Sequence, residues 1–162
     1  MRIGVISDTH IPERAKDIPA QVLDEFKKVD MVIHVGDLID SRVLDVLKKT
    51  CKEVIAVRGN MDIDQSEDAL PDKKVLNISG FKIGVVHGHG HPDKLIGTVT
   101  EIFKDQKLDM IIFGHSHRAL CQQKGKVIYF NPGSPTDTIF APYKSYGLIE
   151  INDKIEARII KL

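Results

Sequence analysis

The sequence predicts an α/β fold in which two packed β-sheets carry helices on their outer faces. Two observations predict it. Short apolar runs typical of buried strands alternate with amphipathic segments over the first 57 residues, and closely spaced strands joined by tight turns follow after residue 70. A chain of 162 residues without linkers or repeats is expected to form one domain, residues 1–162, and can bury roughly 70% of its unfolded surface.

The N-terminal third has the order strand, helix, strand, helix, strand. These elements are expected as strands at 3–6, 31–33 and 54–57 and as helices at about 19–28 and 41–49. In both helices apolar residues recur every three to four positions, and Asp40 or Ser41 stands where the second helix needs an N-cap. Strand–helix–strand units of this kind are right-handed and give a parallel sheet.

The remainder of the chain is richer in antiparallel strands. We expect strands at 74–78, 81–86, 110–113, 120–122, 127–130, 145–151 and 154–160, and a third helix at about 92–104. Turn signals at Ser79-Gly80, Lys124-Gly125 and Asn152-Asp153 join neighbouring strands into hairpins. Antiparallel strands after a parallel unit imply a second sheet packed on the first.

Composition limits the partners of the protein. Lys plus Arg number 23 and Asp plus Glu number 23, so no strong bulk attraction to nucleic acid or to an anionic membrane is expected. No apolar run approaches the ~20 residues of a membrane span, and the N-terminus shows no signal-peptide pattern. Cys51 and Cys121 are widely separated and predict two free thiols. We therefore expect a cytoplasmic protein.

Five polar blocks each follow one of the predicted strands. They are Asp8-Thr9-His10, Gly36-Asp37, Gly59-Asn60, His87-Gly88-His89 and Gly114-His115-Ser116-His117. Ligands bind at the carboxyl ends of strands in open α/β sheets, so we expect these blocks to meet at one sheet edge. Seven of their side chains commonly ligate metals: Asp8, His10, Asp37, Asn60, His87, His115 and His117.

Each block alone also fits a plainer interpretation, namely a turn or capping Asp, a turn Asn, or a hydrogen-bonded core histidine. Asp8 and His10 share one side only if the chain stays extended. The pair His115 and His117 is harder to explain without a metal, because two unpaired buried imidazoles are costly. Taken together, the five blocks predict a site for two metal ions.

The order D-x-H, GD, GN, H, GHxH from Asp8 to His117 resembles the calcineurin-like metallophosphoesterases. The stretch Asn131-Pro132-Gly133-Ser134 resembles the small YfcE-type phosphodiesterases of bacteria and archaea within that family. The resemblance implies a four-layer α/β/β/α sandwich of two mixed β-sheets flanked by helices. It also implies one ion on Asp8, His10, Asp37 and His117, and a second on Asp37, Asn60, His87 and His115, with Asp37 as the bridge. Such mixed ligands suit Mn²⁺, Ni²⁺, Fe or Zn²⁺, and the family points to Mn²⁺ or Ni²⁺.

The implied activity is hydrolysis of a small phosphodiester by attack of a metal-bridging hydroxide. Two alternatives stay open at this point. A phosphomonoesterase or nucleotide pyrophosphatase would use the same metals, and a eukaryotic retromer subunit with this fold acts as an interaction scaffold. Intact ligands at all seven positions argue against a scaffold. A homo-oligomer, either a dimer or a tetramer, is compatible with the sequence.

The block Gly59-Asn60-Met61-Asp62 departs from many family members, which carry a histidine at the position of Met61. That histidine is thought to protonate the leaving group, and a thioether has no proton to donate. The YfcE-type proteins also lack it. The catalytic candidates are therefore Asn60, Asp62 and His89, with Asp62 orienting a ligand or water and His89 contacting the substrate or its leaving group, where it is the candidate to replace the missing acid. His34 is expected to orient a ligand, and His91 to be solvated.

Overall fold

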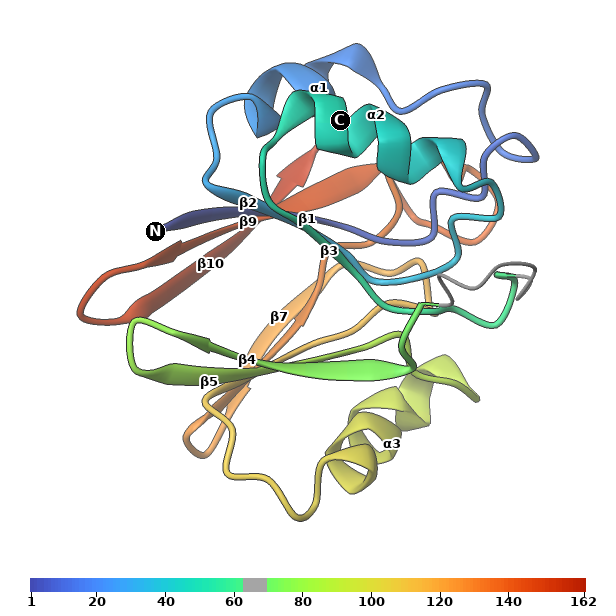
Figure 1. Ribbon diagram of the computed structural model, residues 1–162. Coiled ribbons are helices and arrows are strands. Elements are labelled where there is room, and N and C mark those ends of the chain that lie inside the picture. Colours follow the sequence, from blue (N-terminus) through green and yellow to red (C-terminus); the bar gives the residue numbers. More distant parts are fainter. Residues whose placement is uncertain (63–69) are drawn as a thin grey trace.

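Two five-stranded sheets pack face to face in the computed structural model, which describes residues 1–62 and 70–162 (Figure 1). The first sheet has the order β10-β9-β1-β2-β3. Its strands are β1 (Arg2–Ile6), β2 (Met31–His34), β3 (Val54–Ala56), β9 (Ser145–Ile151) and β10 (Ile155–Lys161). Strands β1, β2 and β3 are parallel, as the alternating strand and helix pattern predicts, and the hairpin β9–β10 adds antiparallel strands beside β1.

The second sheet has the order β4-β5-β6-β8-β7. Its strands are β4 (Lys73–Ile78), β5 (Phe81–Val86), β6 (Met110–Ile112), β7 (Leu120–Lys124) and β8 (Val127–Asn131). The central strands β5, β6 and β8 are parallel, and the edge strands β4 and β7 are antiparallel to their neighbours. Both sheets are therefore mixed, as expected.

The helices lie on the outer faces of the two sheets. They are α1 (Ala20–Phe26) and α2 (Arg42–Thr50) over the first sheet, and the 3₁₀ turn η1 (Pro92–Lys94) with α3 (Leu95–Ile102) over the second (Figure 1). Asp40 Oδ1 accepts a hydrogen bond from the backbone N–H of Arg42, so Asp40 caps the start of α2. The segment expected as one helix at 92–104 divides because a 3₁₀ turn precedes α3, and Phe103 already leaves helical geometry.

Three apolar clusters occupy the spaces between these layers. The first lies between the sheets, where Ile3 and Val5 of β1 face Ile83 of β5 and Met110 of β6, all of them fully buried. The second packs β1 and β2 against α1 and α2, and the third packs the second sheet against α3. The four-layer α/β/β/α arrangement is confirmed. Within the described residues, no helix is long and apolar enough to cross a membrane.

Candidate metal centre

The carboxyl ends of β1, β2, β3, β5 and β6 bring the five polar blocks together. Because β1, β2 and β3 belong to the first sheet and β5 and β6 to the second, the expectation of a single sheet edge was wrong. The chain does not stay extended there: the backbone φ angle is positive at Asp8 (56°), His10 (43°), Asp37 (57°), His115 (66°) and His117 (58°). Non-glycine residues rarely adopt this left-handed region, and such residues cluster at functional sites. Asp8 and His10 therefore share one site through a tightly turned backbone, and the expectation of an extended Asp8-x-His10 was wrong.

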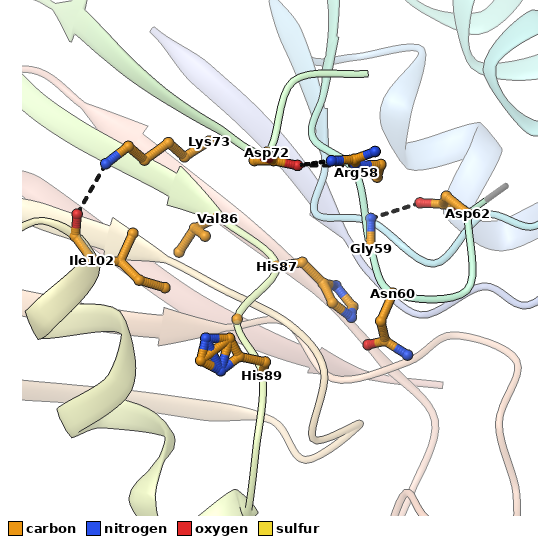
Figure 2. Close-up of a pocket in the computed structure, with 11 residues that line it drawn as sticks. Arg58, Gly59, Asn60, Asp62, Asp72, Lys73, Val86, His87, His89 and Ile102 are labelled. Carbon is orange, nitrogen blue, oxygen red and sulfur yellow. Dashed lines mark hydrogen bonds and ion pairs between the residues drawn. The ribbon is translucent and has the colours of Figure 1, made fainter. Parts of the chain in front are cut away.

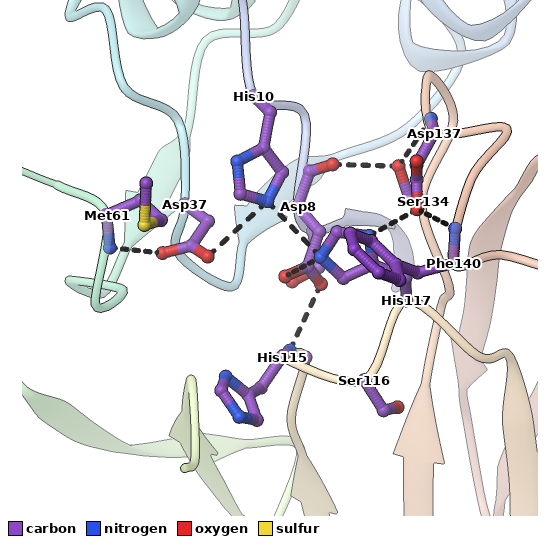
Figure 3. Close-up of polar contacts among 12 residues, drawn as sticks. Asp8, His10, Asp37, Met61, His115, Ser116, His117, Ser134, Asp137 and Phe140 are labelled. Carbon is purple, nitrogen blue, oxygen red and sulfur yellow. Dashed lines mark hydrogen bonds and ion pairs between the residues drawn. The ribbon is translucent and has the colours of Figure 1, made fainter. Parts of the chain in front are cut away.

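Asp8 stands at the centre of two overlapping groups of ligand atoms. The first group is Asp8, His10 and His117, and the second is Asp8, Asp37 and His87. Asp8 Oδ1 lies 3.4 Å from His117 Nε2 and 3.8 Å from His87 Nε2. The Nε2 atoms of His10 and His117 lie 3.2 Å apart (Figure 3).

Asp37 also lies between the two groups. Its Oδ2 atom is 3.4 Å from His10 Nε2 and 3.4 Å from His87 Nε2. Its Oδ1 atom accepts a hydrogen bond of 2.8 Å from the backbone N–H of Met61. One carboxylate oxygen thus faces a histidine from each predicted metal site, which is the placement that a bridging ligand requires.

The polar atoms of this cluster fit divalent cations. Asp8 Oδ1 and His87 Nε2 are buried and have no hydrogen-bond partner within residues 1–62 and 70–162, a costly state unless a ligand satisfies them. Donor atoms around one ion at 2.0–2.2 Å stand about 3 to 3.6 Å apart, which matches most separations above. Carboxylate and imidazole donors suit a divalent transition metal.

The charges of the cluster also favour a bound cation. Burial raises the pKa of Asp8, although the nearby charges of His87 and His117 act against it. Burial also disfavours protonated His87, yet the adjacent carboxylates of Asp37 and Asp8 raise the pKa of His87 to about 9. Two carboxylates at this depth therefore call for positive charge beside them.

Two of the three inner histidines, His87 and His117, are held through their other ring nitrogen. His87 Nδ1 lies 2.6 Å from the carbonyl oxygen of Val35, and His117 Nδ1 lies 2.6 Å from Asp137 Oδ2. Donation from Nδ1 leaves the Nε2 lone pair of a neutral ring free for a metal and fixes the ring orientation. Asp137 is fully buried and was not among the sequence candidates. No local pattern marks it, because only the fold brings it to His117.

The Asn131-Pro132-Gly133-Ser134 stretch and the residues after it brace the ligand loops. Asn131 Nδ2 donates to the carbonyl oxygen of Gly114 at 2.8 Å, and Ser134 Oγ donates to that of Asp8 at 2.7 Å. Thr136 Oγ1 donates to the carbonyl oxygen of Thr9 at 2.7 Å. This segment therefore fixes the backbone beside Asp8 and His115.

Asn60 and His115 lie together at the rim, outside the two inner groups. Asn60 Oδ1 is 2.9 Å from His115 Nδ1, and His115 Nε2 is 3.0 Å from the carbonyl oxygen of Gly90. The His115 ring stands edge-on to His87, with the centroids 5.4 Å apart. The structure thus brings both residues to the site but pairs them with each other and with Gly90.

The Asp62 carboxylate holds backbone at the ends of β2 and β3. It accepts hydrogen bonds from the N–H groups of Asp37, Leu38, Ile39 and Gly59, at 2.9, 2.7, 2.9 and 2.8 Å respectively. These bonds join the loops that carry Asp37 and Asn60. The geometry is that of a residue that positions ligands, one of the two roles expected for it.

The other histidines are divided between the core and the surface. His34 is fully buried, contacts Thr9 Oγ1 at 3.1 Å and accepts from the N–H of Gly36 at 3.2 Å, so it touches residues adjacent to the ligands rather than the ligands themselves. Burial lowers the pKa of His34 to about 4. His91 is exposed, as expected, and accepts from the N–H of Asp93.

Two cavities flank the cluster and share Asn60. One, of about 550 Å³, lies on the side of His87 and includes Asp62, His89, Arg58 and Lys73 (Figure 2). The other, of about 470 Å³, lies on the side of His10 and His117. The candidate His89 lines the first cavity and is not part of the inner cluster.

The order of the strand ends and their ligand atoms agrees with comparisons to known proteins. A model of the calcineurin-like phosphoesterase superfamily domain matches residues 1–154. The chain belongs to this superfamily. A probable metallophosphoesterase of Methanocaldococcus jannaschii is 41% identical, over 100% of this chain and 82% of its own length. Together with the structural neighbours described next, these matches confirm the resemblance to the small YfcE-type phosphoesterases.

Solved structures of two kinds share the calcineurin-like fold over nearly the whole chain. An archaeal phosphodiesterase aligns with a TM-score of 0.78 and 25% identity, covering 100% of both chains. Vps29 of Entamoeba histolytica, solved in complex with Zn²⁺, aligns with a TM-score of 0.77 and 28% identity, covering 99% of both chains. The superfamily implies divalent metal ions, and the residues of this chain fit them.

Proposed function

We propose that this calcineurin-like protein is a phosphodiesterase that uses two divalent metal ions. The observation that carries the proposal is the convergence of two buried carboxylates, Asp8 and Asp37, with the Nε2 atoms of His10, His87 and His117. The burial of Asp8 Oδ1 and His87 Nε2 without hydrogen-bond partners in the described chain adds to it.

The seven predicted ligands divide between the two ions as the resemblance implies. Asp8, His10, Asp37 and His117 would hold one ion, and Asp37, Asn60, His87 and His115 would hold the other. To hold the second ion, Asn60 and His115 would have to give up their mutual contact. When bound, the ions would activate water near neutral pH and neutralise charge on the phosphoryl oxygens. We propose Mn²⁺ or Ni²⁺ as the ions, from the donor set and the family.

The protein's own residues supply orientation. Asp137 and the Val35 carbonyl fix the imidazoles of His117 and His87, and Asp62 fixes the loops of Asp37 and Asn60. Such pre-organisation limits the reorganisation needed when charge shifts in the transition state. We infer that Asn60 stands next to the phosphoryl group, because it alone of the seven predicted ligands lines both cavities.

Two cavities favour a diester over a monoester. A phosphodiester carries two organic groups, and the cavities of about 550 and 470 Å³ on the two sides of the cluster offer a place for each. A monoester would fill only one of them. The archaeal phosphodiesterase with the same fold supports this substrate class.

The test compares hydrolysis of bis(4-nitrophenyl) phosphate and 4-nitrophenyl phosphate by the metal-free protein loaded in turn with Mn²⁺, Ni²⁺, Zn²⁺ and Fe²⁺. Both substrates release the same phenol, so the ratio of kcat/KM reports on diester preference. We expect the diester to be preferred at least about tenfold, roughly the discrimination of 1.4 kcal/mol. A preference for the monoester would assign the site to a phosphomonoesterase.

The likeness to Vps29 over nearly the whole chain is the observation that supports the alternative function, an interaction scaffold. Metal content cannot separate the two functions, since that Vps29 was solved with Zn²⁺. Hydrolysis decides between them: absence of turnover on diester, monoester and pyrophosphate substrates with all four metals would favour a scaffold.

A further inference from the structure

The most exposed large apolar side chains gather in one cavity. Among the residues that the structure describes, five large hydrophobic side chains are exposed, and the three most exposed are Ile139 (65%), Phe140 (59%) and Met61 (44%). All three line the cavity of about 470 Å³ that also contains His10 and His117. Exposed apolar groups gathered beside a functional cluster usually mark a binding surface.

Phe140 is held in place by a residue that also serves the metal cluster. The Asp137 carboxylate accepts hydrogen bonds from the backbone N–H groups of Ile139, Phe140 and Ala141, at 2.9, 3.0 and 3.1 Å. The Phe140 ring stands edge-on to the His117 ring, with the centroids 5.7 Å apart and the planes at 89° (Figure 3). An exposed aromatic ring is thus fixed next to a predicted metal ligand.

Charge around the ring suits an anion with an apolar substituent. The guanidinium carbon of Arg14 lies 5.4 Å from the Phe140 ring centroid. Arg14 and Arg118 line the cavity together with Glu13 and the predicted ligand Asp37, and Arg14 Nε also lies 3.9 Å from Asp137 Oδ1. A phosphoryl group at the cluster would therefore have two guanidinium groups and an apolar surface in the same cavity.

We propose that this cavity is the subsite for an aromatic ester group of the substrate, an aryl group or a nucleobase, with Phe140 and Met61 as its specificity-determining residues. The proposal rests on the proposed phosphodiesterase function. A fixed aromatic ring packs well against a second ring, and a thioether makes favourable contacts with ring edges. Met61, where many relatives carry a proton-donating histidine, thus supplies apolar contact.

The test measures binding of phenylphosphonate and methylphosphonate to the Mn²⁺-loaded protein by calorimetry. Both ligands present the same anionic group and neither has an ester bond to hydrolyse. We expect phenylphosphonate to bind about tenfold more tightly, as partial burial of one ring allows. Phe140→Ala should lower this ratio to about twofold and Phe140→Leu to about threefold, because aliphatic bulk replaces only part of the ring contact. Val46→Ala removes an exposed apolar side chain from α2 and should leave the ratio unchanged.

Equal affinities in the wild-type protein, or a ratio near tenfold in both Phe140 variants, would overturn the subsite. A change in oligomeric state in Phe140→Leu without a change in the ratio would assign the apolar surface to contact between copies of the chain and likewise overturn it. The readout is independent of turnover. A protein that binds phenylphosphonate through Phe140 but hydrolyses no diester would refute the proposed function alone.

Discussion

Replacing Asp137 by asparagine tests how the metal cluster is held together. The carboxylate lies 2.6 Å from His117 Nδ1 and accepts three backbone N–H groups. Burial would raise the pKa of Asp137, but these N–H groups and His117 lower it to about 2. Asparagine keeps the size of the side chain, loses its charge, and brings an NH₂ group that cannot accept these bonds.

The magnitude follows from the pKa. The ordinary value is 3.8 and the folded value about 2, so at 1.36 kcal/mol per pKa unit ionised Asp137 contributes about 2 kcal/mol to the free energy of unfolding. Because the folded pKa is depressed, this contribution is fully present above about pH 4 and is lost as the pH falls through about 2. Residues of this kind behind metal-bound histidines also change metal affinity 10–100-fold.

Two measurements check the prediction. Urea unfolding of the metal-free proteins should show the variant about 2 kcal/mol less stable at pH 7, and the difference should shrink between about pH 4 and pH 2. Calorimetric titration with Mn²⁺ should show one site weakened by at least about tenfold. Asp153→Asn, in the exposed turn before β10, is the matched control. If Asp137→Asn bound Mn²⁺ as tightly as the wild-type protein does, the role of Asp137 in holding His117 would be refuted.

Three further predictions concern the metals and the leaving group. Asp37→Ala should lower kcat/KM for the diester by at least about 10³-fold, because the bridge between the ions is lost; a tenth of the wild-type rate with both metals bound would contradict bridging. Chelation by EDTA should abolish activity while the circular dichroism spectrum stays unchanged, since the apolar clusters do not depend on the metals. Adding Mn²⁺ or Ni²⁺ should restore the rate. Global unfolding on chelation would show that the metal site is structural. In a Brønsted series of diesters the rate should depend steeply on leaving-group pKa, because the Met61 thioether has no proton to donate, and Met61→His should flatten that dependence. A shallow slope in the wild-type protein that becomes steeper in His89→Ala would instead identify His89 as the proton donor.

The sequence predicted the strands, and which strand ends carry the polar blocks, because those features follow from local pattern. It did not predict that these strand ends belong to two sheets. Apolar runs bounded by turn residues predicted ten strands to within a few residues. The polar blocks come directly after five of these runs, so their place at strand ends could be predicted too. The same rule placed Asp8, Asp37 and His87 at the carboxyl ends of β1, β2 and β5, where their ligand atoms lie within 4.8 Å of one another.

What the sequence could not predict depends on contacts between distant segments. The left-handed backbone at five predicted ligands is stabilised by groups such as Asp62 and Ser134, which lie far along the chain from Asp37 and Asp8. Asp137 carries no motif at all. The pairing of Asn60 with His115 likewise joins loops after β3 and β6, which belong to different sheets.

Asp137 links metal binding to the proposed aromatic subsite, and this link separates two kinds of variant. Its carboxylate orients His117 and also holds the backbone that positions Phe140. Asp137→Asn should therefore weaken Mn²⁺ binding and lower the phenylphosphonate-to-methylphosphonate ratio together, whereas Phe140→Ala should lower the ratio at unchanged Mn²⁺ affinity. Both quantities come from calorimetry: the first by titration with Mn²⁺, the second by titration of the Mn²⁺-loaded protein with the two phosphonates, and Asp153→Asn is the control for each. If Asp137→Asn weakened the metal and left the ratio near tenfold, the position of the ring would have to be set by its contacts with Arg14 and His117 instead of by Asp137.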